Sequence, residues 1–164
     1  MVNESWRLCP WADALYAHDH AWWAASKGRE FEGLKIAGEK RAADDFGLHH
    51  VRVRAGDDRI VLDCPGEIGS GGNSGFQALN LAVAWGARRI ALVGFDLSLD
   101  GGKHWHGSHA RGLHNPTESA LSIWRKRLDA AAPHLERIGC EIINASPRSA
   151  LNAYRKAPLE ALWN

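Results

Sequence analysis

A glycine-rich turn followed by a helix and an apolar strand constrains this chain most. Residues 64–75 hold too many glycines for a helix or strand interior, so they predict a loop. From Phe76 onward apolar residues recur at helical spacing, and Gly86 is a suitable helix end. Residues 90–96 then form an apolar run typical of a fully buried strand. Loop, helix, short turn and strand together make half of a βαβ unit.

The remaining sequence also alternates between strand and helix patterns. We expect a helix through Trp22 and Trp23, a long amphipathic helix from Pro116 to about Ile138, and a short helix near the end. Further strands are expected at residues 14–17, 50–54, 58–63 and 140–144. This alternation predicts a single α/β domain over residues 1–164, with a mostly parallel sheet covered on both faces.

Composition and charge limit the partners. The 164 residues are 45% hydrophobic and 24% charged, which is ordinary for one globular domain. A net charge of +1 gives no field that favours nucleic acid or an anionic membrane. No apolar run reaches the roughly 18 residues that span a bilayer, and the start does not resemble a signal peptide. We therefore expect a cytoplasmic protein without a membrane or nucleic-acid partner.

The three cysteines, Cys9, Cys64 and Cys140, are widely spaced and form no C-x-x-C pair. This spacing argues against a disulfide framework and against a Cys-based zinc site. Buried free thiols are the expected outcome.

Four polar clusters should meet at one sheet edge, because ligands in open parallel sheets bind at the carboxyl ends of the strands. They are His18–His20, Gly71–Gly75, Asp96 with the following loop to His114, and Asn144–Ser149. In the second cluster, Gly71, Gly72, Asn73, Ser74 and Gly75 lead directly into a helix, so their backbone N–H groups suit a phosphate or carboxylate. The alternative is a structural turn with Asn73 or Ser74 as the helix N-cap.

The loop after Asp96 contains His104, His106, His109 and His114, together with Lys103 and Arg111. Histidine suits general acid or base work, and the two cations suit phosphate. A metal site completed by Asp96 or by His18–His20 is a rival hypothesis, and a solvated loop without a function is another. Asp19 either contacts a sugar hydroxyl or caps the next helix, and Ser146 and Ser149 either bind a base or phosphate or act as N-caps.

With these residues in view, two stretches carry a family resemblance. The first stretch is residues 71–97, which include the run Trp85-Gly86-Ala87-Arg88-Arg89-Ile90-Ala91-Leu92-Val93-Gly94-Phe95-Asp96. The second is residues 2–23, which include Val2-Asn3, Trp6-Arg7, Asp19 and Trp22-Trp23. They resemble the Rossmann-like proteins of the DUF115 and archaeal pterin-pyrophosphokinase group, including phage-encoded hypothetical proteins, and more distantly the bacterial sialyltransferases that use CMP-activated sialic acid.

The resemblance implies a Rossmann-like three-layer sandwich and a transferase that uses a nucleotide-activated donor, most like glycosyl transfer. Asn3 and the Gly71–Gly75 turn would then contact the nucleotide or nucleotide-sugar ligand, with Ser146 near its cytidine or phosphate. His114 would be the general base, and His106, Lys103 or Arg111 would neutralise the departing phosphate. The pyrophosphokinase branch would add Mg²⁺.

The family's apolar first strand and Gly-Pro-Ser loop have no counterpart ahead of Met1 in this sequence. Two alternatives to the transferase therefore stay open. One is a non-catalytic phage accessory protein that retains the nucleotide pocket, and the other is a His-based metal-dependent hydrolase. The sheet edge that such a strand would cover also suggests a homodimer.

Overall fold

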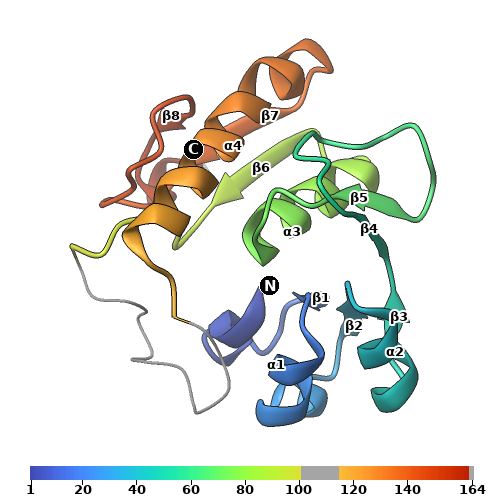
Figure 1. The fold of residues 1–164 in the computed structure, drawn as a ribbon. Helices are drawn as coiled ribbons and strands as arrows, with labels where there is room; N and C mark the ends of the chain where they lie inside the picture. The colour runs from blue at the N-terminus through green and yellow to red at the C-terminus, as the bar shows by residue number, and fades with distance from the viewer. Residues whose placement is uncertain (101–114, 163–164) are drawn as a thin grey trace.

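The structure is a computed structural model that describes residues 1–100 and 115–162. Strands and helices alternate through most of the chain (Figure 1). The strands are β1 (Ala14–Ala17), β2 (Leu34–Ala37), β3 (His49–His50), β4 (Arg52–Arg54), β5 (Glu67–Gly69), β6 (Arg89–Leu92), β7 (Glu141–Asn144) and β8 (Arg155–Lys156). The α-helices are α1 (His20–Ala25), α2 (Lys40–Phe46), α3 (Ser74–Ala84) and α4 (Glu118–Arg137), and the 3₁₀ helices are η1 (Asn3–Arg7), η2 (Gly28–Glu30) and η3 (Leu159–Leu162).

All strand pairs in the described residues are parallel, as the sequence predicts. The strands form three small sheets, ordered β1-β2-β3, β4-β5 and β6-β7-β8. Residues 49–54 pass from one sheet to the next, because β3 pairs with β2 and β4 pairs with β5. An isolated parallel bridge also joins Val2 to Tyr16, beside β1. The observed class is therefore mixed helix and strand with small parallel sheets.

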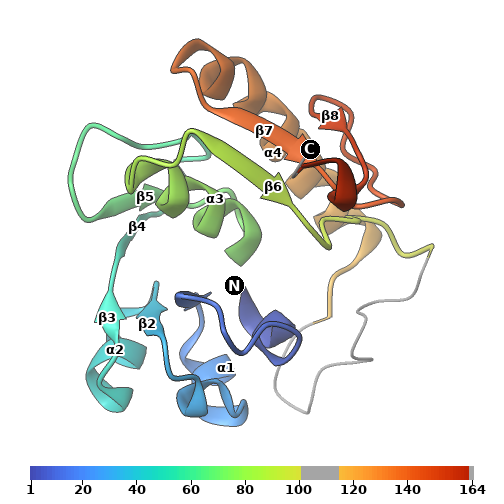
Figure 2. The ribbon, with the colours of Figure 1, turned by 180° about the vertical axis from the view of Figure 1, so that it is seen from behind.

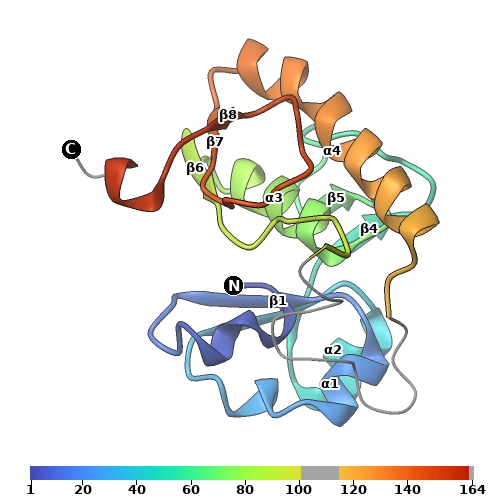
Figure 3. The same ribbon diagram turned by 90° about the vertical axis from the view of Figure 1, so that its left-hand side faces the viewer.

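Helix α3 lies between two groups of elements (Figures 1 and 2). On one side Leu81 packs with Tyr16, Ile36 and Ile68 from β1, β2 and β5. On another side Phe76, Leu79 and Val83 join a core with β6, β7 and α4. The far face of β1 and β2 is covered by α1 and α2, where both tryptophans of α1 are buried. Figure 3 shows the same order, with β1, α1 and α2 on one side of α3 and α4 on the other.

A fully buried asparagine on α3 holds the loop between β4 and β5. The Asn80 side-chain oxygen accepts hydrogen bonds from the backbone N–H groups of Val61 and Gly69, both at 2.8 Å. Its amide nitrogen donates to the Val61 carbonyl at 2.9 Å. These three bonds satisfy backbone groups of Val61 and Gly69 in the protein interior.

This arrangement explains why the expected strand at residues 58–63 is wrong. The apolar run Ile60-Val61-Leu62 is an irregular loop, because Val61 bonds to a side chain of α3 instead of to a strand. The adjacent expectation of loop throughout residues 64–75 is also wrong, since Glu67–Gly69 is β5. Gly69 belongs in that strand because a Cβ there would collide with the Arg59 carbonyl, so only glycine lets the two backbones approach.

Strand β6 overlaps the expected strand but ends at Leu92, so residues 93–96 lie beyond it, and it is less buried than its apolar sequence predicts. Leu92 is buried, whereas Ala91 is exposed and Val93, just beyond the strand, is 57% exposed. Among the described strands only β7 pairs with β6, so its other edge is left open.

Other elements agree with the sequence to different degrees. Strand β1, the helix with Trp22 and Trp23, and strand β7 are confirmed. The long helix begins later than Pro116, because the Thr117 side chain caps it by accepting from Ala120 N–H at 3.2 Å, and Gly139 follows its end at a φ of 72°. β2, α2 and β8 were not anticipated, and the helix near the end is the 3₁₀ helix η3.

The structure also bears on the expected buried thiols and on the expectation that no segment spans a membrane. Cys9, Cys64 and Cys140 are free thiols, but only Cys140 is buried. Within residues 1–100 and 115–162, no helix combines the length and apolar character that crossing a membrane requires.

We predict that Asn80→Ala lowers the free energy of unfolding by about 2–4 kcal/mol, because it leaves buried backbone groups of Val61 and Gly69 without partners. Urea unfolding followed by circular dichroism measures this change. Asn152→Ala, at an exposed position, is the matched control and should cost less than about 0.5 kcal/mol. Similar losses for the two variants would contradict the role assigned to Asn80.

Candidate functional site

The turn before α3 has the geometry of an anion-binding helix start. Gly71 and Gly72 adopt left-handed φ values of 53° and 75°, which glycine tolerates without strain. Asn73 is the N-cap, and its side chain accepts from Phe76 N–H at 2.9 Å. The N–H groups of Ser74 and Gly75 lie in the first turn, where an α-helix offers no internal acceptors. The sequence-based expectation that Asn73 or Ser74 caps this helix is thus confirmed for Asn73, and the start remains suited to an anion.

Two side chains from α4 lie over the same turn. A Cβ placed on Gly72 would collide with the Arg127 guanidinium and would lie 3.3 Å from Trp124 Nε1. Arg127 is held there by an ion pair from its Nε to Asp58 at 2.7 Å. A cation and an aromatic ring therefore stand beside the positive end of α3. Sequence reasoning missed both residues, although the run Trp124-Arg125-Lys126-Arg127 on an amphipathic helix was a usable signal.

The loop after β6 is fixed by the two serines that follow β7. The Ser146 hydroxyl accepts from Phe95 N–H at 2.8 Å and donates to the Leu92 carbonyl, and the Ser149 hydroxyl donates to the Phe95 carbonyl at 2.6 Å. Both serines are buried. Their hydroxyls thus hold backbone, and neither caps a described helix. Any contact of Ser146 or Ser149 with a ligand stays a prediction.

Asp96 follows directly and is exposed. Its backbone carbonyl accepts from Ala150 N–H at 2.8 Å, which ties the two loops together. The next residue, Leu97, has a φ of 51°, and its carbonyl accepts from Arg125 at 2.7 Å. These backbone contacts fix the loop that carries Asp96 beside the loop after β7, although Asp96 lies beyond the end of β6 and does not end the strand as expected.

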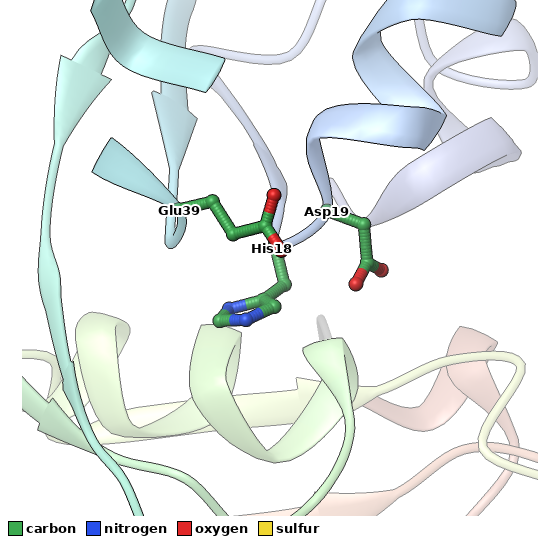
Figure 4. A group of neighbouring side chains, drawn as sticks. All are labelled: His18, Asp19 and Glu39. Atoms are coloured by element: carbon green, nitrogen blue, oxygen red, sulfur yellow. The ribbon is translucent and has the colours of Figure 1, made fainter. Parts of the chain in front are cut away.

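At the end of β1, three side chains converge (Figure 4). One potential donor atom from each of His18, Asp19 and Glu39 lies within 4.8 Å of the other two. Asp19 is the N-cap residue of α1, but its side chain makes no capping hydrogen bond, so the capping role expected for it is wrong. Glu39 follows β2 and was not anticipated, although the short run Leu34–Ala37 before it was a signal for a strand end.

Asn3 lies close to the end of β1, because the residue before it pairs with that strand. It follows Val2, which bridges to Tyr16, and it has a left-handed φ of 48°. Its side-chain oxygen is buried and has no hydrogen-bond partner in the described part of the chain. A buried polar oxygen without a partner is uncommon in folded proteins, and the nucleotide-binding role expected for Asn3 stays a prediction.

A buried hydrogen bond joins the end of β1 to α3. The Tyr16 hydroxyl donates to Gln77 at 2.8 Å, and the Gln77 amide donates in turn to the Ser70 carbonyl at 3.0 Å. Burial raises the pKa of the Tyr16 hydroxyl, and the charge of Asp19 adds to the rise, so this group stays a donor. A chain of two hydrogen bonds therefore connects the end of β1, where His18, Asp19 and Glu39 lie, with the turn at Ser70–Gly75.

Four of the expected site residues, His106, His114, Lys103 and Arg111, lie outside the residues that the structure describes, and so do His104 and His109. The described part of the expected site consists of the β1 end, the α3 turn and the loops after β6 and β7. Two of these parts lie beside α3, because Tyr16 of β1 is hydrogen-bonded to Gln77 and a Cβ on Gly75 would lie 3.1 Å from the Phe95 ring of the loop after β6. That they form one binding site stays a prediction.

A groove of about 660 Å³ lies at the opposite ends of the strands from the Gly71–Gly75 turn. It is lined by Leu34, Leu62 and Trp85 among others, near the starts of β2, β5 and β6. Trp85 is 58% exposed there. The lining is mainly apolar, and His49, His50 and Arg88 also contribute to it.

Comparisons with protein families, curated proteins and solved structures returned no match for this chain. The function is therefore inferred from the chemistry of the residues at the end of β1 and at the α3 turn.

We predict that Gly72→Ala costs more stability than Gly86→Ala. Both glycines have left-handed φ values, 75° and 90°, so alanine strains the backbone at each by about 1–2 kcal/mol. Only at position 72 does the added methyl meet other residues, namely the Arg127 guanidinium, with which it would collide, and Trp124 Nε1 at 3.3 Å. Urea unfolding should show an excess loss of about 1 kcal/mol for Gly72→Ala, within the usual cost of overpacking.

The excess should disappear in an Arg127→Ala background, which a double-mutant cycle would reveal. Equal losses at positions 72 and 86, or an excess that persists without Arg127, would show that Arg127 does not cover the turn.

Proposed function

We propose that this chain binds the phosphate of a nucleotide at the start of α3 and is a transferase that uses a nucleotide-activated donor. The observation that carries this proposal is the position of Arg127 beside Gly72, at the first turn of a helix whose N–H groups face the same place. A guanidinium and a helix start both stabilise a phosphate, and together they form the usual elements of such a site.

The aromatic ring of Trp124 supports a nucleotide over a free phosphate. Its indole nitrogen lies beside Gly72, and the residue is only partly buried. Nucleotide bases stack on aromatic rings with a gain of about 1–3 kcal/mol. In this proposal the phosphate contacts Gly72, Asn73, Ser74 and Gly75, and the base or sugar lies along α4.

The same proposal assigns the fold to the Rossmann-like three-layer sandwiches. The parallel strand pairs support this assignment, and so does the covering of β1 and β2 on both faces, by α1 and α2 on one face and by α3 on the other. In the transfer step His114 would take the proton of the acceptor hydroxyl, and His106, Lys103 or Arg111 would neutralise the departing phosphate, as the family resemblance implies. Asp96, which follows β6, is a further catalytic candidate. Binding without turnover would favour the non-catalytic accessory protein instead.

The test is isothermal titration of the full chain with CMP, UDP, GDP and ATP, each with and without Mg²⁺. Arg127→Gln should weaken binding of the preferred nucleotide by 10-fold or more, since a hydrogen bond to a charged group contributes about 1.5–3 kcal/mol. Arg41→Gln, an exposed arginine on α2, is the control and should leave the affinity unchanged. No binding of any nucleotide, or equal affinity for wild type and Arg127→Gln, would refute the site.

A further inference from the structure

The three side chains at the end of β1 carry an inference of their own. His18 directly follows β1, Asp19 precedes α1, and Glu39 joins β2 to α2. Each offers one donor atom, and the three atoms lie within 4.8 Å of one another. Figure 4 shows the side chains of Asp19 and Glu39 on either side of His18, whose ring is directed toward α3.

This separation is close to what a metal ion requires. Donor atoms that bind one ion at about 2.1 Å lie about 3–4 Å apart, so small rotations of these side chains would bring them into place. Two carboxylates held this near one another also repel, and a divalent cation between them removes that repulsion.

An unsatisfied ring nitrogen is the independent sign of a ligand. His18 Nδ1 is buried and has no hydrogen-bond partner among the described residues. It also stands so close to Gly38 that a Cβ on that residue would collide with it, and Tyr16 Oη would be 2.6 Å from the same Cβ. Leaving a polar nitrogen buried without a partner costs stability. The tight packing against Gly38 thus holds the His18 ring in place, while its Nδ1 lacks a hydrogen-bond partner among the described residues.

One of the carboxylates is already oriented from behind. Glu39 Oε2 accepts from the His20 backbone N–H at 2.7 Å, which fixes the carboxylate while leaving its other oxygen available. Outer contacts of this kind commonly position metal ligands. The His20 ring is itself held by Asp45 at 2.9 Å, which keeps it out of the cluster.

We propose that His18, Asp19 and Glu39 form a three-ligand site for a divalent transition-metal ion such as Zn²⁺ or Mn²⁺. One imidazole and two carboxylates suit these ions better than Ca²⁺, which prefers oxygen ligands throughout. Three protein ligands leave a coordination position open for water or for a ligand oxygen. The site stands independently of nucleotide binding at the α3 turn.

The test is titration of the full chain with Mn²⁺, followed by the electron paramagnetic resonance signal of the free ion, and then displacement by Zn²⁺. We expect one site per chain that is lost or at least 10-fold weaker in Asp19→Asn and in Glu39→Gln. Both changes keep the side-chain shape, and Glu39→Gln keeps an oxygen for the His20 N–H. Asp44→Asn, an exposed carboxylate on α2 paired with Lys40, should bind Mn²⁺ as wild type does.

The histidines of residues 104–114 are a second source of metal ligands, so the variants decide the question and wild-type binding alone does not. Circular dichroism without metal checks that each variant is folded. Full Mn²⁺ affinity in both Asp19→Asn and Glu39→Gln, absence of any binding to the wild type, or equal displacement by Ca²⁺ and Zn²⁺ would overturn the proposal.

Discussion

The burial of α3 on two sides is the constraint on which the rest of this structure depends. The helix packs against β1, β2 and β5 through Leu81 and against the core of β6, β7 and α4 through Phe76, Leu79 and Val83. Because its first turn is placed by both sets of contacts, the Gly71–Gly75 turn has a fixed position between them. Asn80 adds a polar tie from the same helix to the loop before β5, which carries Asp58, the partner of Arg127.

Two candidate binding features follow from this placement. The start of α3 meets Arg127 and Trp124 from α4, while the end of β1 meets Glu39 from the end of β2. Tyr16 and Gln77 connect the two by a buried hydrogen bond. Both residues of this connection, Tyr16 and Gln77, are buried. The connection therefore holds the two binding features in a fixed relation to each other. If both proposals hold, the residues that would hold the metal ion and those that would hold the nucleotide phosphate lie at the two ends of this hydrogen-bonded connection.

Much of this arrangement could be predicted from the sequence, because it depends on local signals. Glycine spacing located the α3 turn, helical periodicity located α3 and α4, and the alternation of elements gave parallel strands. The errors arose where a tertiary contact replaced a local preference. Ile60–Leu62 has the composition of a strand, yet Asn80, nearly twenty residues away, takes its hydrogen bonds. Gly69 has the composition of a loop residue, yet it pairs with Arg54 in the β4–β5 sheet. A glycine is needed there because the Arg59 backbone passes close to it.

The site was predictable to the same limited degree. His18 and Asp19 directly follow β1 and could be placed by topology alone, whereas Asp96 lies beyond the end of β6. Arg127 and Glu39 carried weaker signals. The run at residues 124–127 does not show which face α4 presents, and the short run Leu34–Ala37 only weakly indicates a strand. The hydroxyls of Ser146 and Ser149 illustrate the reverse case, because side chains at the right edge turned out to hold the backbone near Phe95.

The most direct test of the central claim is a ¹⁵N-resolved NMR titration of the full chain with the nucleotide that binds best. We expect the largest shifts on the amides of Gly72, Asn73, Ser74 and Gly75 and on the Arg127 side-chain Nε–H. Shifts concentrated instead around Trp85 and Leu62, in the groove at the opposite ends of the strands, would contradict it.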